Sequence, residues 1–210
     1  MGAVITVAQQ KGGAGKTTLV AHLAVAFRQA GRSVATIDID PQGSLTRWQE
    51  ARAERLNGAT AIPHSRINGW RAAGEVEKLA RAHDLVLVDS PPHMETEARI
   101  AVRAARLVIV PVQPSPMDFW ATRPTLDMAA AEKVPAILVL NRVPPRARLA
   151  DDLIARIAEL GAPVADSRIG NRTAFAGALL VGLGVSEAAR RTQAAEEIEA
   201  LAAEILSRIG

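Results

Sequence analysis

Short apolar runs alternate with helix-like segments along the whole chain. Five runs are rich in aliphatic residues: 4–8, 33–39, 85–88, 107–112 and 136–140. Between and after them, apolar residues recur three and four positions apart, which is typical of helices with one buried face. These helical patterns cover residues 16–30, 71–82, 95–104, 125–131, 149–160 and 196–209. The alternation predicts an α/β fold with a mostly parallel central sheet and helices on both of its faces.

Polar residues follow each apolar run, at the point where the expected strand ends. These polar segments are 11–18, 38–42, 89–92, 114–118 and 141–142. Ligands of parallel α/β sheets bind beside the carboxyl ends of the strands, so we expect the five segments to meet in one crevice. The sequence shows no internal repeat, linker or low-complexity stretch, and residues 1–210 are therefore expected to form a single domain.

Composition excludes several classes of protein. The chain has no cysteine, so disulfides, thiolate zinc sites and cysteine-ligated iron–sulfur clusters are ruled out. Aromatic residues make up 3% of the chain, which leaves Ala, Val, Leu and Ile to build the core. The first residues lack the basic flank of a signal peptide, and no apolar run approaches the ~20 residues of a membrane span. We therefore expect a cytoplasmic protein.

The strongest local pattern is the run Lys11-Gly-Gly-Ala-Gly-Lys16-Thr-Thr18, which lies between an expected strand and an expected helix. Glycines allow the backbone N–H groups of such a turn to surround an anion, and the helix N-terminus adds a favourable dipole. In this setting Lys16 reaches the β- and γ-phosphates and the Thr17 hydroxyl binds Mg²⁺. The expected nucleotide-binding residues here are Lys11, Gly12, Gly13, Ala14, Gly15, Lys16, Thr17 and Thr18.

Carboxylates and an amide end three other strands. Asp89 follows four apolar residues, as in a Walker B strand whose carboxylate holds Mg²⁺ through a water. Asp38 and Asp40 are two residues apart, so on an extended chain they point to the same side, and Asp38 is a further candidate metal ligand. Asn141 offers a donor and an acceptor. Without a phosphate loop, Asp38 and Asp40 would be a capping or turn pair. Many buried strands end in Asp, and a turn-forming role is the alternative for Asn141.

The loop departs from G-x-x-x-x-G-K-[ST], because Gln10 replaces the first glycine and Lys11 is an extra lysine. In both respects it resembles the deviant Walker A motif of the ParA/MinD family, within the SIMIBI class of P-loop NTPases. The resemblance extends over nearly the whole chain, through Asp38-Ile-Asp-Pro-Gln42 and Pro111-Val-Gln-Pro-Ser-Pro-Met-Asp-Phe119. It looks closest to small ParA partition ATPases of the ParF type, which lack an N-terminal DNA-binding domain.

The resemblance implies a mechanism. Lys11 would reach the nucleotide of a partner subunit, so that ATP binding and homodimer formation become one event. Asp40 would orient the attacking water and Asn141 would contact the adenine. Together with Lys16, Lys11 and Asp40 form the expected catalytic set, with ATP and Mg²⁺ as cofactors. Hydrolysis would be weak alone and stimulated by a ParB-like protein or a cargo adaptor.

Family members of this type bind DNA non-specifically as ATP dimers, and the resemblance places DNA contacts at Arg172, Arg190 and Arg191. Second-tier candidates are Arg142, Arg146, Arg148 and Arg168. Arginine on phosphate gives affinity without sequence recognition, which implies a nucleoid-associated ATPase that positions a plasmid, a chromosome region or a protein cluster. Surface ion pairs are the alternative explanation of these arginines.

Two other functions remain open. A MinD-like ATPase would bind membranes, but the polar face of the expected last helix is acidic, which argues against stable membrane association. A metabolic ATP-dependent ligase would share the fold, but the sequence shows no motif for a small-substrate pocket. ATP-dependent DNA binding would separate these alternatives from the partition ATPase.

Overall fold

The computed structural model describes residues 1–57, 62–67, 71–92, 95–145 and 148–210. Within these residues six strands form one sheet in the order β3-β2-β4-β1-β5-β6, and all neighbouring strands are parallel. The strands are β1 Ala3–Val7, β2 Val34–Asp38, β3 His64–Arg66, β4 Leu85–Asp89, β5 Leu107–Val112 and β6 Ala136–Leu140. The predicted parallel α/β fold is confirmed.

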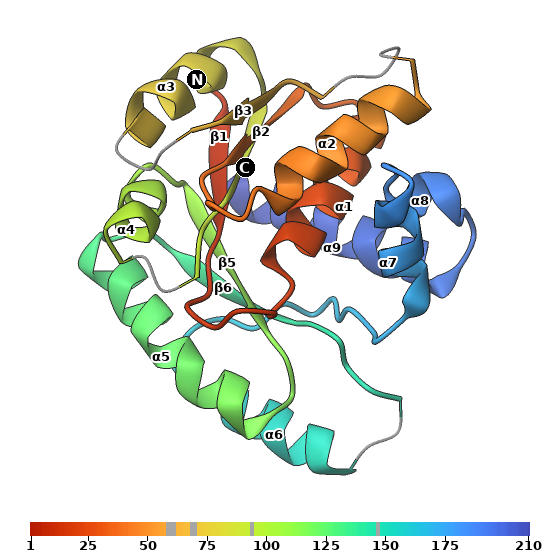
Figure 1. Cartoon of the computed structure of the whole chain (residues 1–210). Helices are drawn as coiled ribbons and strands as arrows, with labels where there is room; N and C mark the ends of the chain where they lie inside the picture. Colours follow the sequence, from red (N-terminus) through yellow and green to blue (C-terminus); the bar gives the residue numbers. More distant parts are fainter. Residues whose placement is uncertain (58–61, 68–70, 93–94, 146–147) are drawn as a thin grey trace.

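Helices cover both faces of the sheet (Figure 1). One face carries α1 Lys16–Gln29, α2 Ser44–Arg55, α7 Thr173–Leu180, α8 Val185–Ala188 and α9 Gln193–Ile209. The other face carries α3 Ala72–Ala82, α4 Glu95–Arg103, α5 Pro116–Ala131 and α6 Arg148–Ala158. Among the described residues, no helix has the length and apolar character needed to cross a membrane.

Strand β4 shows how one apolar run serves both faces. Leu85 and Leu87 belong to the core beneath α1 and α9, whereas Val86 and Val88 belong to the core beneath α3. All four side chains are buried. Side chains alternate across a strand, so a strand covered on both faces must be apolar at every position.

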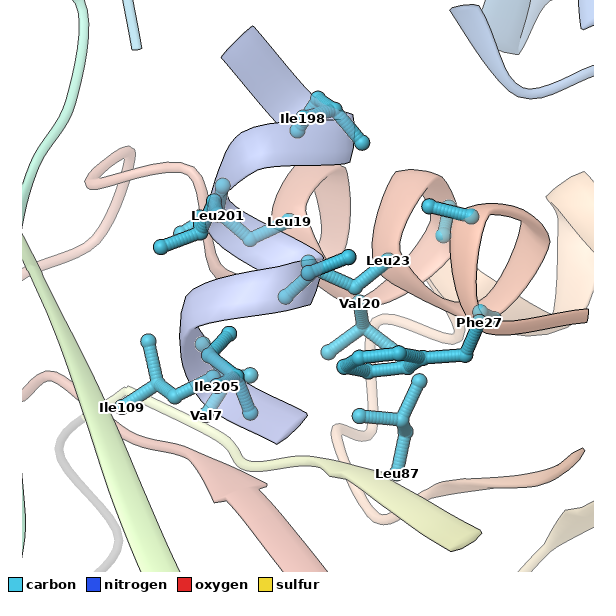
Figure 2. Packing of buried hydrophobic residues seen from close by; sticks show 14 of the residues in the cluster. Val7, Leu19, Val20, Leu23, Phe27, Leu87, Ile109, Ile198, Leu201 and Ile205 are labelled. Atoms are coloured by element: carbon cyan, nitrogen blue, oxygen red, sulfur yellow. The ribbon is translucent and has the colours of Figure 1, made fainter. Parts of the chain in front are cut away.

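Helix α1 lies at the centre of the molecule and is buried on every side from Leu19 to Phe27. Ile198 and Leu201 of α9 pack against it over the sheet (Figure 2). The helix ends just before Gly31, which adopts a left-handed φ of 80°. The helix was expected to bury one face, but α2, α7, α8 and α9 surround it as well.

Several elements differ from the expectation. Helix α5 begins at Pro116 rather than at residue 125, because Ser115 caps it by accepting a hydrogen bond from the Asp118 N–H, and it continues through Pro124. The short edge strand β3 and helices α2, α7 and α8 were not expected. Helix α2 is strongly polar, and its buried residues are Leu45, Trp48 and Arg52.

A partly buried ion pair connects α2 to α8. The Arg52 guanidinium donates to both carboxylate oxygens of Glu187 at 2.7 Å and to the carbonyl oxygen of Gly182 at 3.1 Å. The indole N–H of Trp48 donates to the Leu183 carbonyl at 3.3 Å. These contacts explain why a helix with few apolar residues docks securely.

Candidate nucleotide-binding site

The loop between β1 and α1 forms the floor of the site. Gly13 and Gly15 have φ values of 77° and 95°, which side chains with a Cβ rarely adopt. A Cβ on Gly15 would also lie 2.3 Å from Nδ2 of Asn141. The two glycines therefore give the loop the backbone curvature that a phosphate cradle needs.

Side chains that follow two of the strands donate hydrogen bonds to the backbone of this loop. Asn141, at the end of β6, donates from Nδ2 to the Ala14 carbonyl oxygen at 2.7 Å. Gln113, at the end of β5, donates from Nε2 to the Gly13 carbonyl oxygen at 2.9 Å. Oδ1 of Asn141 accepts from the Arg142 N–H at 3.0 Å, so both ends of its amide are used. The adenine contact expected for Asn141 stays a prediction, and its observed task is to fix the loop.

Lys16 lies buried at the start of α1, where its ammonium group donates to the carbonyl oxygens of Gln9 at 3.0 Å and Lys11 at 3.4 Å. Burial lowers the pKa of Lys16, and the charges of Asp89 and Asp40 oppose that shift. Both of these hydrogen-bond partners are neutral carbonyl oxygens, and a bound phosphate would supply a negative charge in direct contact with the ammonium group. This surrounding therefore suits the phosphate-binding role predicted for Lys16.

Thr17 and Asp89 face each other across the end of β4. The Thr17 hydroxyl donates to Oδ2 of Asp89 at 2.6 Å, and Asp89 Oδ1 is buried with no hydrogen-bond partner among the described residues. Burial raises the pKa of Asp89 to about 7, against the hydrogen bond from Thr17. This hydroxyl and this carboxylate are hard oxygen donors of the kind that Mg²⁺ prefers.

No group of three or more His, Asp or Glu side chains suited to a metal ion occurs within the described residues. The protein alone thus offers Mg²⁺ a small ligand set, which matches the usual binding of this ion through one or two side chains, waters and phosphate oxygens. Thr17 and Asp89 would hold it. The donor set fits a Mg–nucleotide complex better than a free metal ion.

The two aspartates after β2 have separate tasks. Asp38 is fully buried; its Oδ2 accepts from the backbone N–H of Thr46 at 2.9 Å and from its hydroxyl at 2.8 Å. Its Oδ1 accepts from the Asp40 N–H at 3.1 Å. Asp38 thus anchors the start of α2, and its role as a further metal ligand stays a prediction. Asp40 is the aspartate that lines the crevice described next.

A crevice of about 730 Å³ opens above the loop. Its lining includes the polar residues Lys16, Thr17 and Asp40 and the apolar residues Trp48 and Leu179. Ligand pockets of about 300–1,000 Å³ accept small molecules of nucleotide size. The predicted convergence of strand ends on one crevice is confirmed for β1 and β2, for β4 through Pro92 and for β6 through Arg142. No residue of segment 114–118, after β5, is among the described residues that line it.

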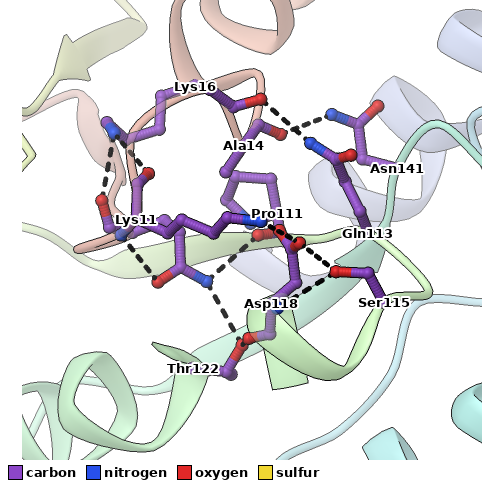
Figure 3. A network of polar contacts seen from close by, with 11 residues as sticks. Lys11, Ala14, Lys16, Pro111, Gln113, Ser115, Asp118, Thr122 and Asn141 are labelled. Atoms are coloured by element: carbon purple, nitrogen blue, oxygen red, sulfur yellow. Dashed lines mark hydrogen bonds and ion pairs between the residues drawn. The ribbon is translucent and has the colours of Figure 1, made fainter. Parts of the chain in front are cut away.

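Lys11 has a different orientation from Lys16. Its side chain is about one-third exposed, and its ammonium group forms an ion pair with Asp118 at the start of α5 (Figure 3). Lys11 is not among the residues that line the crevice. Of the two lysines of this loop, Lys16 therefore lines the crevice and Lys11 points to Asp118 on α5.

The candidate DNA-binding arginines do not form one group. Arg172 donates from its guanidinium to Glu197 of α9, with a closest distance of 2.6 Å. Arg190 and Arg191 are exposed between α8 and α9, where they share a groove with acidic residues of α9. Arg142 has a left-handed φ of 52° and lines the crevice instead. The ion pair of Arg172 corresponds to the alternative explanation considered for these arginines.

The second-tier arginines lie elsewhere. Arg168 is exposed in the segment before α7, and Arg148 begins α6. Arg146 lies outside the described residues. The structure also shows contacts for residues to which sequence analysis gave no individual role. Asp118 and Gln9 contact the loop, and the capping pattern Ser-Pro-Met-Asp was a usable sign of the helix that carries Asp118.

A glycine-rich loop between a parallel strand and a helix, with a buried lysine, a threonine hydroxyl and a strand-end aspartate, defines a P-loop nucleotide-binding protein. The sequence matches the CobQ/CobB/MinD/ParA nucleotide binding domain over residues 5–185, and the chain belongs to this family. Members of the ParA/MinD branch are P-loop ATPases, as the deviant loop at Lys11 implies.

Named relatives fall within the same branch. The "Maintenance of carboxysome distribution protein A" of Halothiobacillus neapolitanus is 31% identical, over 96% of this chain and 95% of that protein. The chromosome-partitioning ATPase Soj of Thermus thermophilus is 28% identical, over 98% and 96%. The solved septum site-determining protein MinD of Pyrococcus horikoshii, complexed with Mg-ADP, has a TM-score of 0.80 at 19% identity, over 100% and 98%. This likeness confirms the fold.

Proposed function

We propose that this chain is a ParA-like ATPase that forms a homodimer when it binds ATP and Mg²⁺, and that the dimer binds DNA without sequence preference to position a cargo. The arrangement of Lys11 and Lys16 carries the proposal. Lys16 faces the crevice of its own subunit, whereas Lys11 is on the same loop but turned away from that crevice. A lysine so placed can serve the nucleotide of a second subunit.

Weak hydrolysis follows from the same arrangement. Asp40 lines the crevice near enough to raise the pKa of Lys16, which places a carboxylate where it can orient a water. Lys11 would add a second positive charge near the transferred phosphoryl group once two subunits have met. Because that charge arrives from outside the subunit, a monomer hydrolyses ATP slowly and a partner that stabilises the competent dimer accelerates it.

The proposed DNA surface is centred on Arg190 and Arg191. Both are exposed in the connection between α8 and α9, and contacts with phosphates need no defined pocket. Arg172 can join them only if it exchanges Glu197 for phosphate, so it is a weaker contributor. Two subunits double the contact set, which makes DNA binding depend on ATP.

The names of two relatives support a proposal about the cargo. One is named for carboxysome distribution and another for chromosome partitioning, and both span almost this whole chain. The first is 31% identical and the second 28%, which supports a protein assembly as the cargo over a chromosome region. An adaptor protein on the cargo would stimulate hydrolysis, and the ATPase would work in the cytoplasm on nucleoid DNA as a single domain.

The test is binding to non-specific DNA with ATP and Mg²⁺, measured over a range of salt concentrations. We expect ATP-dependent, salt-sensitive binding that Lys11→Ala abolishes and Arg191→Ala weakens by about tenfold, since each lost phosphate contact weakens binding and lowers its salt dependence. Arg81→Ala, an exposed arginine on α3 paired with Glu77, is the control. Liposome binding, or rapid ATP turnover that needs a small substrate, would favour the two alternatives instead.

A further inference from the structure

The carboxylate of Asp118 is buried and depends on Lys11 for its charge balance. Its Oδ2 accepts hydrogen bonds from the Lys11 ammonium group and the Ser115 hydroxyl (Figure 3). Asp118 is 0% exposed, and its Oδ1 has no partner among the residues that the structure describes. A buried carboxylate that loses its cation keeps the cost of desolvation without the compensating attraction.

Asp118 cannot readily follow Lys11, because α5 is fastened to the start of the loop. Gln9 donates from Nε2 to the Thr122 hydroxyl at 3.2 Å and accepts at Oε1 from the Thr125 hydroxyl at 3.3 Å. The Gln10 N–H donates to the Thr125 hydroxyl at 3.3 Å. The partly exposed Lys11 side chain is thus paired with a carboxylate on α5, a helix that is itself hydrogen-bonded to the start of the loop.

We propose that Asp118 is a positioning residue that holds Lys11 on its own subunit and competes with the partner's nucleotide for it. The inference rests on the proposed function, in which Lys11 crosses to the partner. On dimer formation, Lys11 of each subunit would leave the Asp118 carboxylate of its own subunit and bind a phosphate of the partner's nucleotide. The Lys11–Asp118 ion pair sets how much ATP-bound protein is needed before the dimer forms.

Asp118 also occupies the third residue of α5, where a carboxylate stabilises a helix end whatever Lys11 does. Asp118→Asn separates the two roles, because it removes the charge and retains the size and an oxygen that can accept from Ser115. Asp127→Asn is the matched control. Asp127 lies on the same helix, and its carboxylate pairs with Arg123 in an exposed position.

The first measurement uses the full chain without nucleotide. An amine-reactive reagent modifies exposed lysines, and mass spectrometry follows the rate at Lys11, with the exposed Lys78 as internal reference. We expect Asp118→Asn to raise the rate at Lys11 by about threefold or more, since a charge-assisted hydrogen bond is lost. Asp127→Asn should leave it unchanged. Equal rates in wild type and Asp118→Asn would overturn the proposal.

The second measurement is the dimer dissociation constant with a non-hydrolysable ATP analogue and Mg²⁺, from analytical ultracentrifugation. We expect Asp118→Asn to lower it by about tenfold or more, because two ion pairs open per dimer. Because Lys11→Ala is expected to prevent the dimer, Asp118→Asn in that background should leave the protein monomeric, whereas an effect of Asp118 that does not act through Lys11 would shift assembly in this background as well.

An unchanged or raised dissociation constant, with Lys11 labelled faster, would show that the ion pair exists without regulating assembly and would overturn the proposal. A wild-type chain that stays monomeric with the analogue would contradict the proposed function, and the regulatory role of Asp118 with it. The labelling rates identify a failure of the ion pair alone, because they need neither nucleotide nor dimer.

Discussion

The Thr17 hydroxyl and the Asp89 carboxylate meet at 2.6 Å at the mouth of the phosphate loop, and the second oxygen of Asp89 has no partner among the described residues. Burial raises the pKa of Asp89 to about 7. A carboxylate in this position is poorly solvated and gains from a nearby cation. The pair is therefore the part of the site that should make nucleotide binding depend on Mg²⁺.

Asp89→Asn tests that dependence. We expect the affinity for ATP in the presence of Mg²⁺ to fall by about 10–100-fold, the usual effect of losing a group that orients a metal's ligands. With excess chelator, wild type and variant should bind alike. Titration calorimetry with and without Mg²⁺ measures both affinities. The control is Asp84→Asn, because Asp84 immediately precedes the first residue of β4, at the opposite end from Asp89. A variant with the full Mg²⁺ enhancement would rule out this role of Asp89.

The Arg52–Glu187 pair predicts a large effect on stability. Glu187→Gln leaves the nearly inaccessible guanidinium of Arg52 without its counter-charge, so we expect a loss of about 3 kcal/mol in the free energy of unfolding. The exposed pair Arg123–Asp127 provides the comparison, and Asp127→Asn should cost less than about 0.5 kcal/mol. Urea denaturation measures both. Equal small losses would mean that α2 is held by other contacts.

His22 predicts how stability depends on pH. It is fully buried in α1, its Nδ1 accepts from the Val185 N–H at 3.0 Å, and burial lowers its pKa from 6.5 to about 4. Between these values the unfolded chain binds a proton that the folded chain excludes. The contribution of neutral, buried His22 to the free energy of unfolding is therefore complete above pH 6.5, and it is lost as the pH falls toward 4.

The expected loss from His22 between pH 7.5 and pH 5 is about 2 kcal/mol. His22→Gln, which cannot take up the proton, should lack this part of the decline, and comparison with wild type cancels all other titrating groups. Urea denaturation at the two pH values measures the difference. His83→Gln, at the end of α3, is the control. A variant that declines as steeply as wild type would show that His22 is protonated in the folded state.

The sequence was sufficient to predict every described strand except β3, together with the floor of the site. Parallel strands buried on both faces are continuous apolar runs, and the loop motif sets its own geometry through Gly13 and Gly15. The strand bounds for residues 107–112 and 136–140 agree with β5 and β6. These features depend on local pattern alone.

Features that depend on distant partners could not be predicted. Helix α2 is stabilised by the pair of Arg52 with Glu187, residues 135 positions apart, and no periodicity reports such a contact. Asp118 lies 107 residues from Lys11. Asn141 lies 127 residues from Ala14, whose carbonyl oxygen its amide binds; the adenine contact expected for it stays a prediction. In each case the partner, and not the residue type, decides the role.

The central claim is that ATP binding drives homodimer formation. The oligomeric state of the Asp40→Ala variant in solution tests it most directly, because Asp40 lines the crevice but is not part of the phosphate loop. With hydrolysis blocked, ATP and Mg²⁺ should convert this variant to a dimer, ADP should leave it monomeric, and adding Lys11→Ala should prevent the dimer. Sedimentation velocity measures all three. The account predicts a dimer with ATP and Mg²⁺ and a monomer with ADP, and a variant that stays monomeric with ATP and Mg²⁺ would contradict it.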